Sequence, residues 1–331
     1  MTLEIKTSNI QPVRQTYAYI ERRFGNKPAT RYQEVSFDIQ GEVNFHYRPL
    51  WKPDKTLNDK SHTALEMKDW YVFKDPRQFY YGAYVQHRAR LQETTENNYA
   101  FFEKRRLVEN LSNDVKQKII SSLLPFRYVE QTANLHMMSG SAYGYGTVIT
   151  QACIFAAMDR LGMAQYLSRI GLIIDDNSAQ ALDQAKEYWM NHPMWQALRR
   201  LCEFSLIEQD WFKLYILQTL LIDSMLHVLL HEELDQWFVQ HDGRDLAMLT
   251  EFMQECSNDL RKWSDSVVKA AIAESKYNQA LIQEWIEELL PQVRSAFETW
   301  SEAALGHKNI DSALNLITER CKKAGLILNL A

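Results

Sequence analysis

A scarcity of helix-breaking residues is the feature that most constrains the fold of this chain. Only 11 glycines and 8 prolines occur among its 331 residues, and residues 194–240 contain neither type. Glycine costs backbone entropy in a helix and proline removes a backbone donor, so long stretches without them favour long helices. Because no stretch shows a convincing strand–helix–strand alternation, we predict an all-α bundle.

Capping signals divide the chain after residue 74 into successive helices. Asp75-Pro76-Arg77-Gln78 is typical of an N-cap, a proline in the first turn and a capping box. Two or three helices are predicted within residues 276–325. Helix starts are also predicted near Ser112, after GSAYGYG, at Ser178, at Pro193 and at Gly243. A break is predicted at Pro125, and a helix end is predicted near Leu161-Gly162.

Residues 1–74 differ from the helical part, residues 75–331. They contain Pro12, Pro28, Pro49 and Pro53 and the alternating stretch EVSFDIQGEVNFHY, which predict an extended arm with short strand-like pieces. One interpretation is an arm that clasps a neighbouring subunit. The other is an ordered tail that folds back on its own domain.

Composition indicates a soluble, cytoplasmic protein. Hydrophobic residues make up 46% and charged residues 24% of the chain, and a net charge of −5 gives no electrostatic case for nucleic-acid binding. The four cysteines are widely separated and form no C-x-x-C pair, which is typical of free thiols in a reducing compartment. The N-terminal residues lack the apolar run of a signal peptide, and the most apolar stretch, residues 215–230, is too short to span a bilayer.

The stretch RYVEQTANLHMM places a glutamate on an inward helix face. Glu130 shares this face with Phe126, Ala133 and Met137 at heptad-like spacing. Helical proteins that bind two iron ions take one Glu from each of two helices and Glu-x-x-His from each of two others. Glu130 therefore stands where an iron ligand would, and Ala133 stands where its histidine partner is needed.

Two other candidate ligand positions depart from that pattern. Gln218 is the polar member of an otherwise apolar stripe, and a neutral amide is a poor substitute for a carboxylate on iron. Glu251 and Gln254 form Glu-x-x-Gln, and Glu251 lies roughly opposite the apolar stripe of its helix. We therefore predict that Glu130, Ala133, Gln218, Glu251 and Gln254 are degenerate positions and hold no metal.

Glu130 and Gln218 have two interpretations. They form part of a polar cluster that fills the space of a metal centre, or Glu130 lies at a water-lined gap or an interface. An isolated buried carboxylate is costly, so Glu130 is expected to be protonated or hydrogen-bonded.

Three further side chains form the best remaining metal constellation. Asp223, His227 and His231 follow at i, i+4 and i+8, but HVLLHEE is not the H-E-x-x-H motif. Their face lies away from the apolar stripe, so we predict a solvated or partner-facing surface. His136 is predicted to be a hydrogen-bonded packing residue, and no nucleophile and base are paired in the sequence.

Four stretches together resemble one protein family. They are RRFGNKPATRYQEVSFDIQ at 22–40, NFHYRPLW at 44–51, DPRQFYYGAYVQHRARLQE at 75–93 and AMDRLGMAQYLSRIGLIID at 157–175. The chain resembles the β, non-catalytic hydroxylase subunit of bacterial multicomponent monooxygenases, and the phenol hydroxylase branch in particular. The resemblance extends over nearly the whole sequence.

The resemblance implies a ferritin-like, ribonucleotide-reductase-like bundle without iron of its own. It implies a hydroxylase that is a dimer of αβγ trimers, with the di-iron centre in the larger α subunit and a small γ subunit. A regulatory component and a reductase with NADH, FAD and an iron–sulfur cluster complete the system, which converts phenol to catechol. The candidate subunit contacts are aromatic residues of the arm: Tyr32, Phe37, Phe45, Tyr47 and Trp51.

Three alternatives to the phenol hydroxylase interpretation remain open. The chain could be the β subunit of a related toluene or alkene monooxygenase. It could be a stand-alone helical di-iron enzyme, although this requires Glu-x-x-His pairs that the sequence lacks. It could also be a helical scaffold outside oxygenase chemistry.

Overall fold

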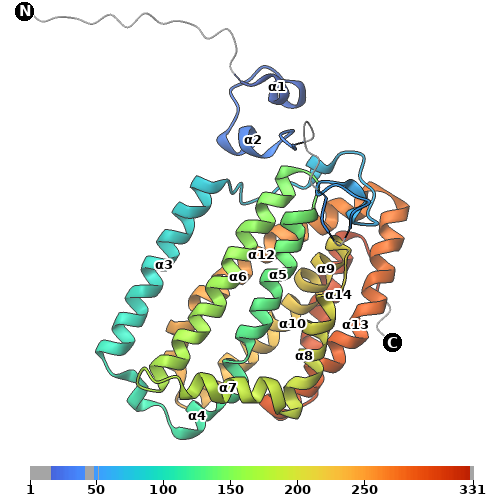
Figure 1. The fold of residues 1–331 in the computed structure, drawn as a ribbon. Coiled ribbons are helices and arrows are strands. Elements are labelled where there is room, and N and C mark those ends of the chain that lie inside the picture. Colours follow the sequence, from blue (N-terminus) through green and yellow to red (C-terminus); the bar gives the residue numbers. More distant parts are fainter. Residues whose placement is uncertain (1–15, 42–47, 51, 329–331) are drawn as a thin grey trace, which may run out of the picture.

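The computed structural model describes residues 16–41, 48–50 and 52–328, and within these ranges the chain forms helices and no β-strand (Figure 1). The α-helices are α1 Ala18–Phe24, α2 Arg31–Ser36, α3 Tyr81–Lys104, α4 Asn113–Lys118, α5 Phe126–Tyr143, α6 Thr147–Ile174, α7 Gln180–Asn191, α8 Pro193–Ser205, α9 Trp211–Ile216, α10 Asp223–Val228, α11 Asp235–Gln240, α12 Ala247–Glu274, α13 Lys276–Leu305 and α14 Asp311–Ala324. Short 3-10 turns are η1 Lys60–His62, η2 Trp70–Val72, η3 Leu107–Asn110 and η7 Arg244–Leu246, and the π-helical segments are η4 Ile119–Leu123, η5 Leu217–Ile222 and η6 Leu229–Leu234. The prediction of an all-α fold is confirmed.

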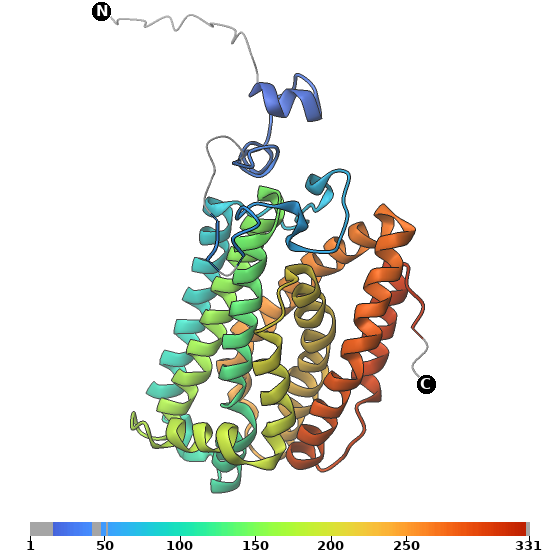
Figure 2. The same cartoon turned by 45° about the vertical axis from the view of Figure 1, so that its right-hand side comes forward.

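The long helices run roughly along one direction and form a bundle. In Figure 1, α3, α6 and α5 lie next to one another at the front, with α12 and α10 behind them and α7 crossing one end. Figure 2 shows the last helices, drawn in orange and red, along one edge of the bundle. The largest fully buried side chains include Trp195, Trp211, Trp263 and Trp300, so aromatic rings fill much of the space between the helices.

Helices α5 and α6 form the closest helix pair of the bundle. A short turn at residues 144–146 joins them, and they pack against each other along much of their length. A Cβ atom at Gly140 would lie only 2.8 Å from the Sγ atom of Cys153, so the close approach of the two helices depends on glycine at this position. Asn134 of α5 donates a hydrogen bond from Nδ2 to the backbone oxygen of Ala157 in α6, at 2.7 Å.

Several predicted helix boundaries are confirmed by their capping contacts. The Ser112 hydroxyl accepts a hydrogen bond from the Val115 amide, and α4 begins at Asn113, the residue after Ser112. Helix α8 begins at Pro193, as predicted. Helix α7 begins at Gln180, two residues after Ser178, with Ala179 as its N-cap residue, and the Ser178 hydroxyl accepts a hydrogen bond from the Gln180 amide. Pro125 separates the π-helical segment η4 from α5, as the predicted break requires.

The predicted helix start at Asp75 is wrong. The Asp75 carboxylate accepts hydrogen bonds at 2.9 Å from both the backbone amide and the guanidinium of Arg77, and this local turn replaces the capping box. Gln78 then has a φ of 53°, which is incompatible with a right-handed helix. Helix α3 consequently begins at Tyr81.

The predicted end at Leu161-Gly162 is also wrong, because α6 continues to Ile174. A single glycine in a helix costs only about 1 kcal/mol relative to alanine. Arg160 and Met163, which flank Leu161-Gly162, are buried against the rest of the bundle, and the burial of such residues along α6 outweighs the glycine.

The most apolar stretch is longer than the sequence indicated. Trp211–Gln240 is a continuous helical segment of 30 residues, and in the part of the chain that the structure describes it is the one helix long and apolar enough to cross a membrane. The prediction that this stretch is too short to span a bilayer is therefore wrong. Within its most apolar window, 83% of the residues are buried inside the bundle, which is the pattern of a core helix.

The arm contains short helices where strand-like pieces were expected. Thr30 and Gln33 form a reciprocal capping box, which starts α2 just before the stretch predicted to alternate like a strand, and the helix includes the first three residues of that stretch. Two hydrogen bonds connect the arm to the N-terminal end of α6. Gln151 of α6 donates to the Ser36 hydroxyl, and the backbone amide of Gly146, just before α6, donates to Gln40 Oε1.

Two of the candidate contact residues in the arm are buried in this chain itself. Tyr32 is 6% and Phe37 is 2% exposed, and their rings pack edge to face. Both belong to the chain's own core, and their role in contacts with a neighbouring subunit stays a prediction. Phe45, Tyr47 and Trp51 lie outside the described residues, and the domain boundary at residue 74 remains a prediction.

Candidate functional site

Glu130 lies on the buried face of α5, as its spacing predicted. Phe126, Ala133 and Met137 are each at most 1% exposed, and Glu130 is 5% exposed. Burial raises the pKa of Glu130 to about 7, with the Arg160 guanidinium opposing the shift and the Asp223 carboxylate adding to it. The expectation that Glu130 is hydrogen-bonded is confirmed, since its partner is Arg160.

Arg160 links two buried carboxylates that come from different helices. It enters from α6, and its Nη1 atom lies 3.2 Å from Glu130 Oε2 on α5. Its Nη2 atom pairs with Asp223 Oδ2 on α10. Burial opposes the charge of Arg160, but Asp223 and Glu130 together outweigh it, so the pKa of Arg160 is raised above its ordinary value. The guanidinium thus acts as a fixed cation between the two acids.

Gln218 extends this network from the π-helical segment η5. Its Nε2 atom donates to Asp223 Oδ1 at 2.8 Å, and its side chain is fully buried. Residues five apart lie about 140° apart on an α-helix, whereas the wider turn of a π-helix brings them close to one face. The π-helical segment therefore explains why Gln218 and Asp223 meet.

His136 closes the network on the side of α8. Its Nδ1 atom lies 3.0 Å from Gln218 Oε1 and its Nε2 atom lies 2.7 Å from the Ser205 hydroxyl. Burial lowers the pKa of His136 to about 4, so the ring is neutral near pH 7. Because the amide oxygen can only accept, Nδ1 carries the proton and Nε2 is the acceptor. His136 is a hydrogen-bonded packing residue, as predicted.

We refer to Glu130, Arg160, Asp223, Gln218, His136 and Ser205 as the buried polar network. The hypothesis that Glu130 and Gln218 belong to one polar cluster is confirmed, since Arg160 and Asp223 connect them. The prediction that Asp223 lies on a solvated face is wrong, because it faces this network. His227 and His231 on the same segment are half-buried, and a partner-facing surface at these two residues stays a prediction.

The other candidate ligand positions do not join the network. Glu251 is exposed on α12, as its position opposite the apolar stripe predicted, and Gln254 is half-buried. Across the described ranges, no group of three or more His, Cys, Asp or Glu side chains is arranged to hold a metal ion. Ala133 carries no donor, and the two acids of the network, Glu130 and Asp223, are already paired with Arg160.

Asp159, the neighbour of Arg160, serves a separate buried network. It accepts hydrogen bonds from Arg88 Nε at 2.9 Å, from Arg88 Nη2 at 2.8 Å and from the Tyr84 hydroxyl at 3.0 Å. Arg88 also donates from Nη1 to Asp259 of α12 at 2.9 Å. Two consecutive residues of α6 therefore connect it to α3 and α12 on one side and to α5 and α10 on the other.

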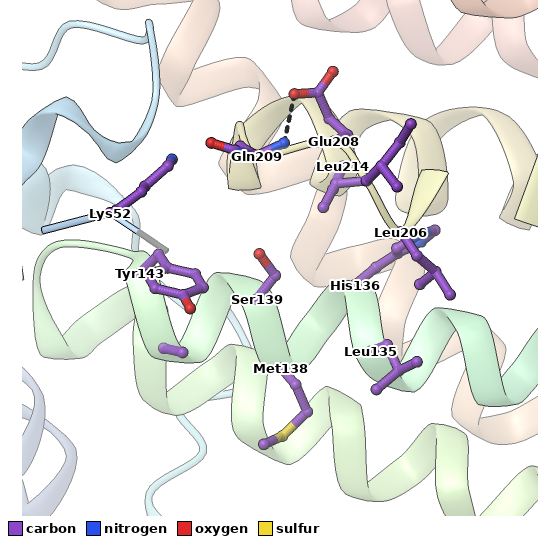
Figure 3. A pocket seen from close by; sticks show the side chains of 12 residues that line it. Lys52, Leu135, His136, Met138, Ser139, Tyr143, Leu206, Glu208, Gln209 and Leu214 are labelled. Carbon is purple, nitrogen blue, oxygen red and sulfur yellow. Dashed lines mark hydrogen bonds between the residues drawn. The ribbon is translucent and has the colours of Figure 1, made fainter. Parts of the chain in front are cut away.

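An open hollow of about 640 Å³ lies between α5 and the loop that joins α8 to α9 (Figure 3). Leu135, Met138 and Tyr143 line it from α5, and Leu206 and Leu214 line the facing side. His136 borders the hollow, but both of its ring nitrogens are occupied by Gln218 and Ser205. The lining therefore supplies no free histidine base for a nucleophile.

Arg160 was not predicted as a site residue, although the sequence contains a signal for it. Asp159 and Arg160 are the only Asp, Glu, Lys or Arg residues between Thr147 and Ser168. Ending the predicted helix at Leu161 concealed that this pair lies near the middle of a long buried helix. Charged residues in such a position require partners, which would have directed attention to Glu130.

Comparisons with known proteins agree with this fold. A family described as methane/phenol/alkene hydroxylase matches residues 51–275. The chain is 68% identical over 98% of both sequences to phenol 2-monooxygenase, oxygenase component MhpL, of Acinetobacter pittii strain PHEA-2. It is 22% identical over 83% of its length, and 86% of the relative's, to the hydroxylase component subunit beta of the toluene-4-monooxygenase system of Ectopseudomonas mendocina.

A solved structure also matches over nearly the whole chain. It is the crystal structure of xenon-pressurized phenol hydroxylase from Pseudomonas sp. OX1, with a TM-score of 0.93 and 43% sequence identity, and it covers 98% of this chain and 99% of that chain. Together with the family match, this likeness places the bundle among known hydroxylase folds. The chain therefore belongs to the methane/phenol/alkene hydroxylase family.

Proposed function

We propose that this chain is the non-catalytic β-type subunit in the oxygenase component of a multicomponent phenol 2-monooxygenase. The substrate class is supported by the 68% identity to a phenol 2-monooxygenase oxygenase component, which far exceeds the 22% identity to the toluene-4-monooxygenase relative. The assignment as the non-catalytic subunit rests on the chemistry of the interior.

The single observation that carries the proposal is the position of Arg160 between Glu130 and Asp223. A di-iron centre of this fold type requires four carboxylates and two histidines that face the interior. Here Ala133 and Gln218 supply neither, and the two acids of the buried polar network already share one guanidinium as their partner. The residues present do not fit a di-iron centre, so we assign no catalytic step to this chain.

The role that follows is mechanical. Ligand helices of a catalytic subunit must be held to within about 0.5 Å by their supporting shell. A bundle with aromatic packing and buried ion pairs is a rigid surface against which such a subunit can pack. Arg160 and Arg88 each connect helices of this bundle and hold them in a fixed arrangement.

The proposal includes the assembly that the family resemblance implies. The chain would join a larger di-iron α subunit and a small γ subunit in a dimer of αβγ trimers in the bacterial cytoplasm. Electrons would come from NADH through a reductase with FAD and an iron–sulfur cluster, and a regulatory component would act on the complex. Aromatic hydroxylation would take place in the α subunit.

The test compares the isolated chain with a co-expressed hydroxylase. We expect the isolated chain to contain no stoichiometric iron and to form no catechol from phenol. The complex with the larger subunit is expected to contain iron and, when the reductase is supplied, to form catechol. Iron is measured by elemental analysis and catechol by chromatography. Stoichiometric iron and catechol formation in the isolated chain would show that the proposal is wrong.

A further inference from the structure

Oxidisable aromatic rings follow one another across four helices of the bundle. Tyr128 of α5 stacks on Trp189 of α7, with ring centroids 5.4 Å apart. Trp189 lies 5.8 Å from Trp195 of α8, and Trp195 lies 6.2 Å from Trp300 of α13. Phe126 lies 5.0 Å from Trp195 and 5.2 Å from Trp300, so it contacts both rings. We call Tyr128, Trp189, Trp195 and Trp300 the aromatic series.

The aromatic series leads from the core to the surface. Trp195 and Trp300 are 0% exposed and Trp189 is 6% exposed, whereas Tyr128 is partly exposed. Indole and phenol are among the side chains that lose an electron most readily, and rings at these separations exchange electrons rapidly. The aromatic series can therefore carry one electron at a time between the buried Trp300 ring and the solvent side of α5.

The two innermost ring nitrogens have no base that could receive a proton. Trp195 Nε1 donates a hydrogen bond at 2.9 Å to the backbone oxygen of Ser121, which is a very weak base. Among the described residues, the buried Nε1 atom of Trp300 has no hydrogen-bond partner. A tryptophan radical cation at either position therefore keeps its proton, remains a strong oxidant and takes an electron from the next ring.

Tyr128 differs because its proton can leave. Arg127 donates a hydrogen bond from Nη2 to the Tyr128 hydroxyl oxygen at 2.7 Å. Since a guanidinium can only donate, it does not take up the hydroxyl proton, which passes to water at this partly exposed position. Loss of the proton converts the oxidised phenol into a neutral tyrosyl radical, which is a weaker oxidant than a tryptophan radical cation. An oxidising equivalent that enters the aromatic series therefore comes to rest at Tyr128.

We propose that the aromatic series carries oxidising equivalents out of the core to Tyr128. An oxygen-centred radical at the α13 side takes one electron from Trp300. Trp195 then reduces Trp300, and Trp189 reduces Trp195. Tyr128 finally reduces Trp189 and releases one proton to water. The balance is one electron gained by the oxidant and one electron and one proton lost by Tyr128, and a thiol in solution restores the phenol by donating a hydrogen atom.

Such a path protects sulfur side chains in the core. Met194 and Cys202 are 5% and 1% exposed on the same helix as Trp195. Oxidation would turn the methionine into a polar sulfoxide and disrupt the packing around it. The source of the oxidant rests on the proposed function, because an oxygenase works with activated oxygen. The electron path itself depends only on this chain.

The test supplies an oxidant at the inner end of the aromatic series in the full-length chain. The native cysteines are at most 1% exposed, so a ruthenium polypyridyl label attaches at Ala303→Cys, an exposed position three residues after Trp300. Light and an external electron acceptor oxidise the label by one electron, and the label then takes one electron from the chain. We expect the absorption of a tyrosyl radical to appear as that of a tryptophan radical decays.

Two variants distinguish an electron path from ordinary packing. Tyr128→Phe removes only the terminal hydroxyl, and we expect it to lose most of the tyrosyl signal and to prolong the tryptophan radical. Trp195→Phe keeps a ring in the core but interrupts the series, and the same loss is expected. The control is Trp237→Phe, because Trp237 stacks on His241 outside the series, and it should leave the signal unchanged. Circular dichroism verifies the fold of each variant.

A tyrosyl radical formed at the wild-type yield in Tyr128→Phe, or in folded Trp195→Phe, would overturn the inference. A labelled chain that forms no tyrosyl radical at all would overturn it as well. Tyr128→Phe changes a partly exposed position, so it decides the outcome even where Trp195→Phe fails to fold. None of these results bears on the proposed function, because the test uses neither iron nor the larger subunit.

Discussion

The inner and outer faces of the α5–α6 pair differ in the kind of side chain that they carry. The inner face holds Glu130 and Arg160 away from water, and each is paired. The outer face exposes Leu135, Met138 and Met158 to water, and neither helix carries an exposed charge over residues 128–143 and 147–168. Most helices of soluble proteins show the reverse distribution. The difference shows that the inner charges are satisfied within this chain, whereas the outer apolar residues have no covering element in the part of the chain that the structure describes.

The largest expected effect comes from removing the cation of the inner face. Arg160→Met leaves Glu130 and Asp223 buried without a counter-ion, and breaking a buried pair in this way costs about 3–5 kcal/mol. Urea unfolding of the isolated chain measures this loss. The control is Arg169→Met on the same helix, since Arg169 pairs with Glu96 at a partly exposed position and its loss costs less than about 1 kcal/mol.

A triple variant sharpens the interpretation of that loss. Arg160→Met combined with Glu130→Gln and Asp223→Asn removes all three charges together, and replacing a buried ion pair by neutral groups is often close to neutral in stability. We expect the triple variant to recover most of the stability. If Arg160→Met alone were as stable as the wild type, the inner face would not depend on its charges.

Alanine substitutions at two consecutive methionines compare the contributions of the two faces to stability directly. Met137 is 1% exposed and Met138 is 41% exposed on the same turn of α5. Met137→Ala is expected to cost about 2–5 kcal/mol of unfolding free energy because it leaves a cavity in the core. Met138→Ala is expected to change the stability of the isolated chain by less than about 0.5 kcal/mol. Equal effects in denaturant titrations would remove the distinction between the two faces.

A change of pH is expected to alter the free energy of unfolding more gradually, over the range between the pKa values of Glu130 in the unfolded and folded chain. Glu130 titrates near 4.5 in the unfolded chain, and burial raises its pKa to about 7 in the folded chain. Between these values the folded state binds more protons, so the contribution of Glu130 to stability falls as pH rises, by roughly 3 kcal/mol over the window.

Comparison with Glu130→Gln isolates this contribution. The stability of the wild type relative to the variant should decline between pH 4.5 and 7, as measured by urea unfolding at several pH values. His136 acts with the opposite sign, because burial lowers its pKa to about 4 and stability then rises with pH up to about 6.5. His136 is present in both proteins, so its effect cancels in the difference. A flat difference would contradict the paired, buried state of Glu130.

The sequence was sufficient wherever a local signal agreed with tertiary packing. The caps at Ser112 and Pro193 and the buried face that contains Glu130 follow from side-chain chemistry and helical periodicity alone. The start at Asp75 failed because the guanidinium of Arg77, two residues later, binds the capping carboxylate. That competition depends on side-chain position, which a motif does not specify.

The site was harder to predict because it depends on contacts between distant segments. Gln218 and Asp223 meet through a π-helical turn, and the pattern expected for an α-helix places them on different faces. Arg160 lies 30 residues from Glu130 and 63 from Asp223, so no local spacing connects them. The exposed apolar positions of α5 and α6 are visible in the sequence only as a lack of charged residues, and the structure is needed to show that they are exposed.

The adjacent acid and base at positions 159 and 160 have a consequence for how the molecule can move. Asp159 fastens α6 to α3, and Arg160 fastens it to α5 and α10. A sliding displacement of α6 by even one helical position would separate both sets of ionic contacts at once. A displacement of α6 is therefore opposed by its ionic contacts with α3, α5 and α10 together, and these four helices are expected to move as one rigid unit.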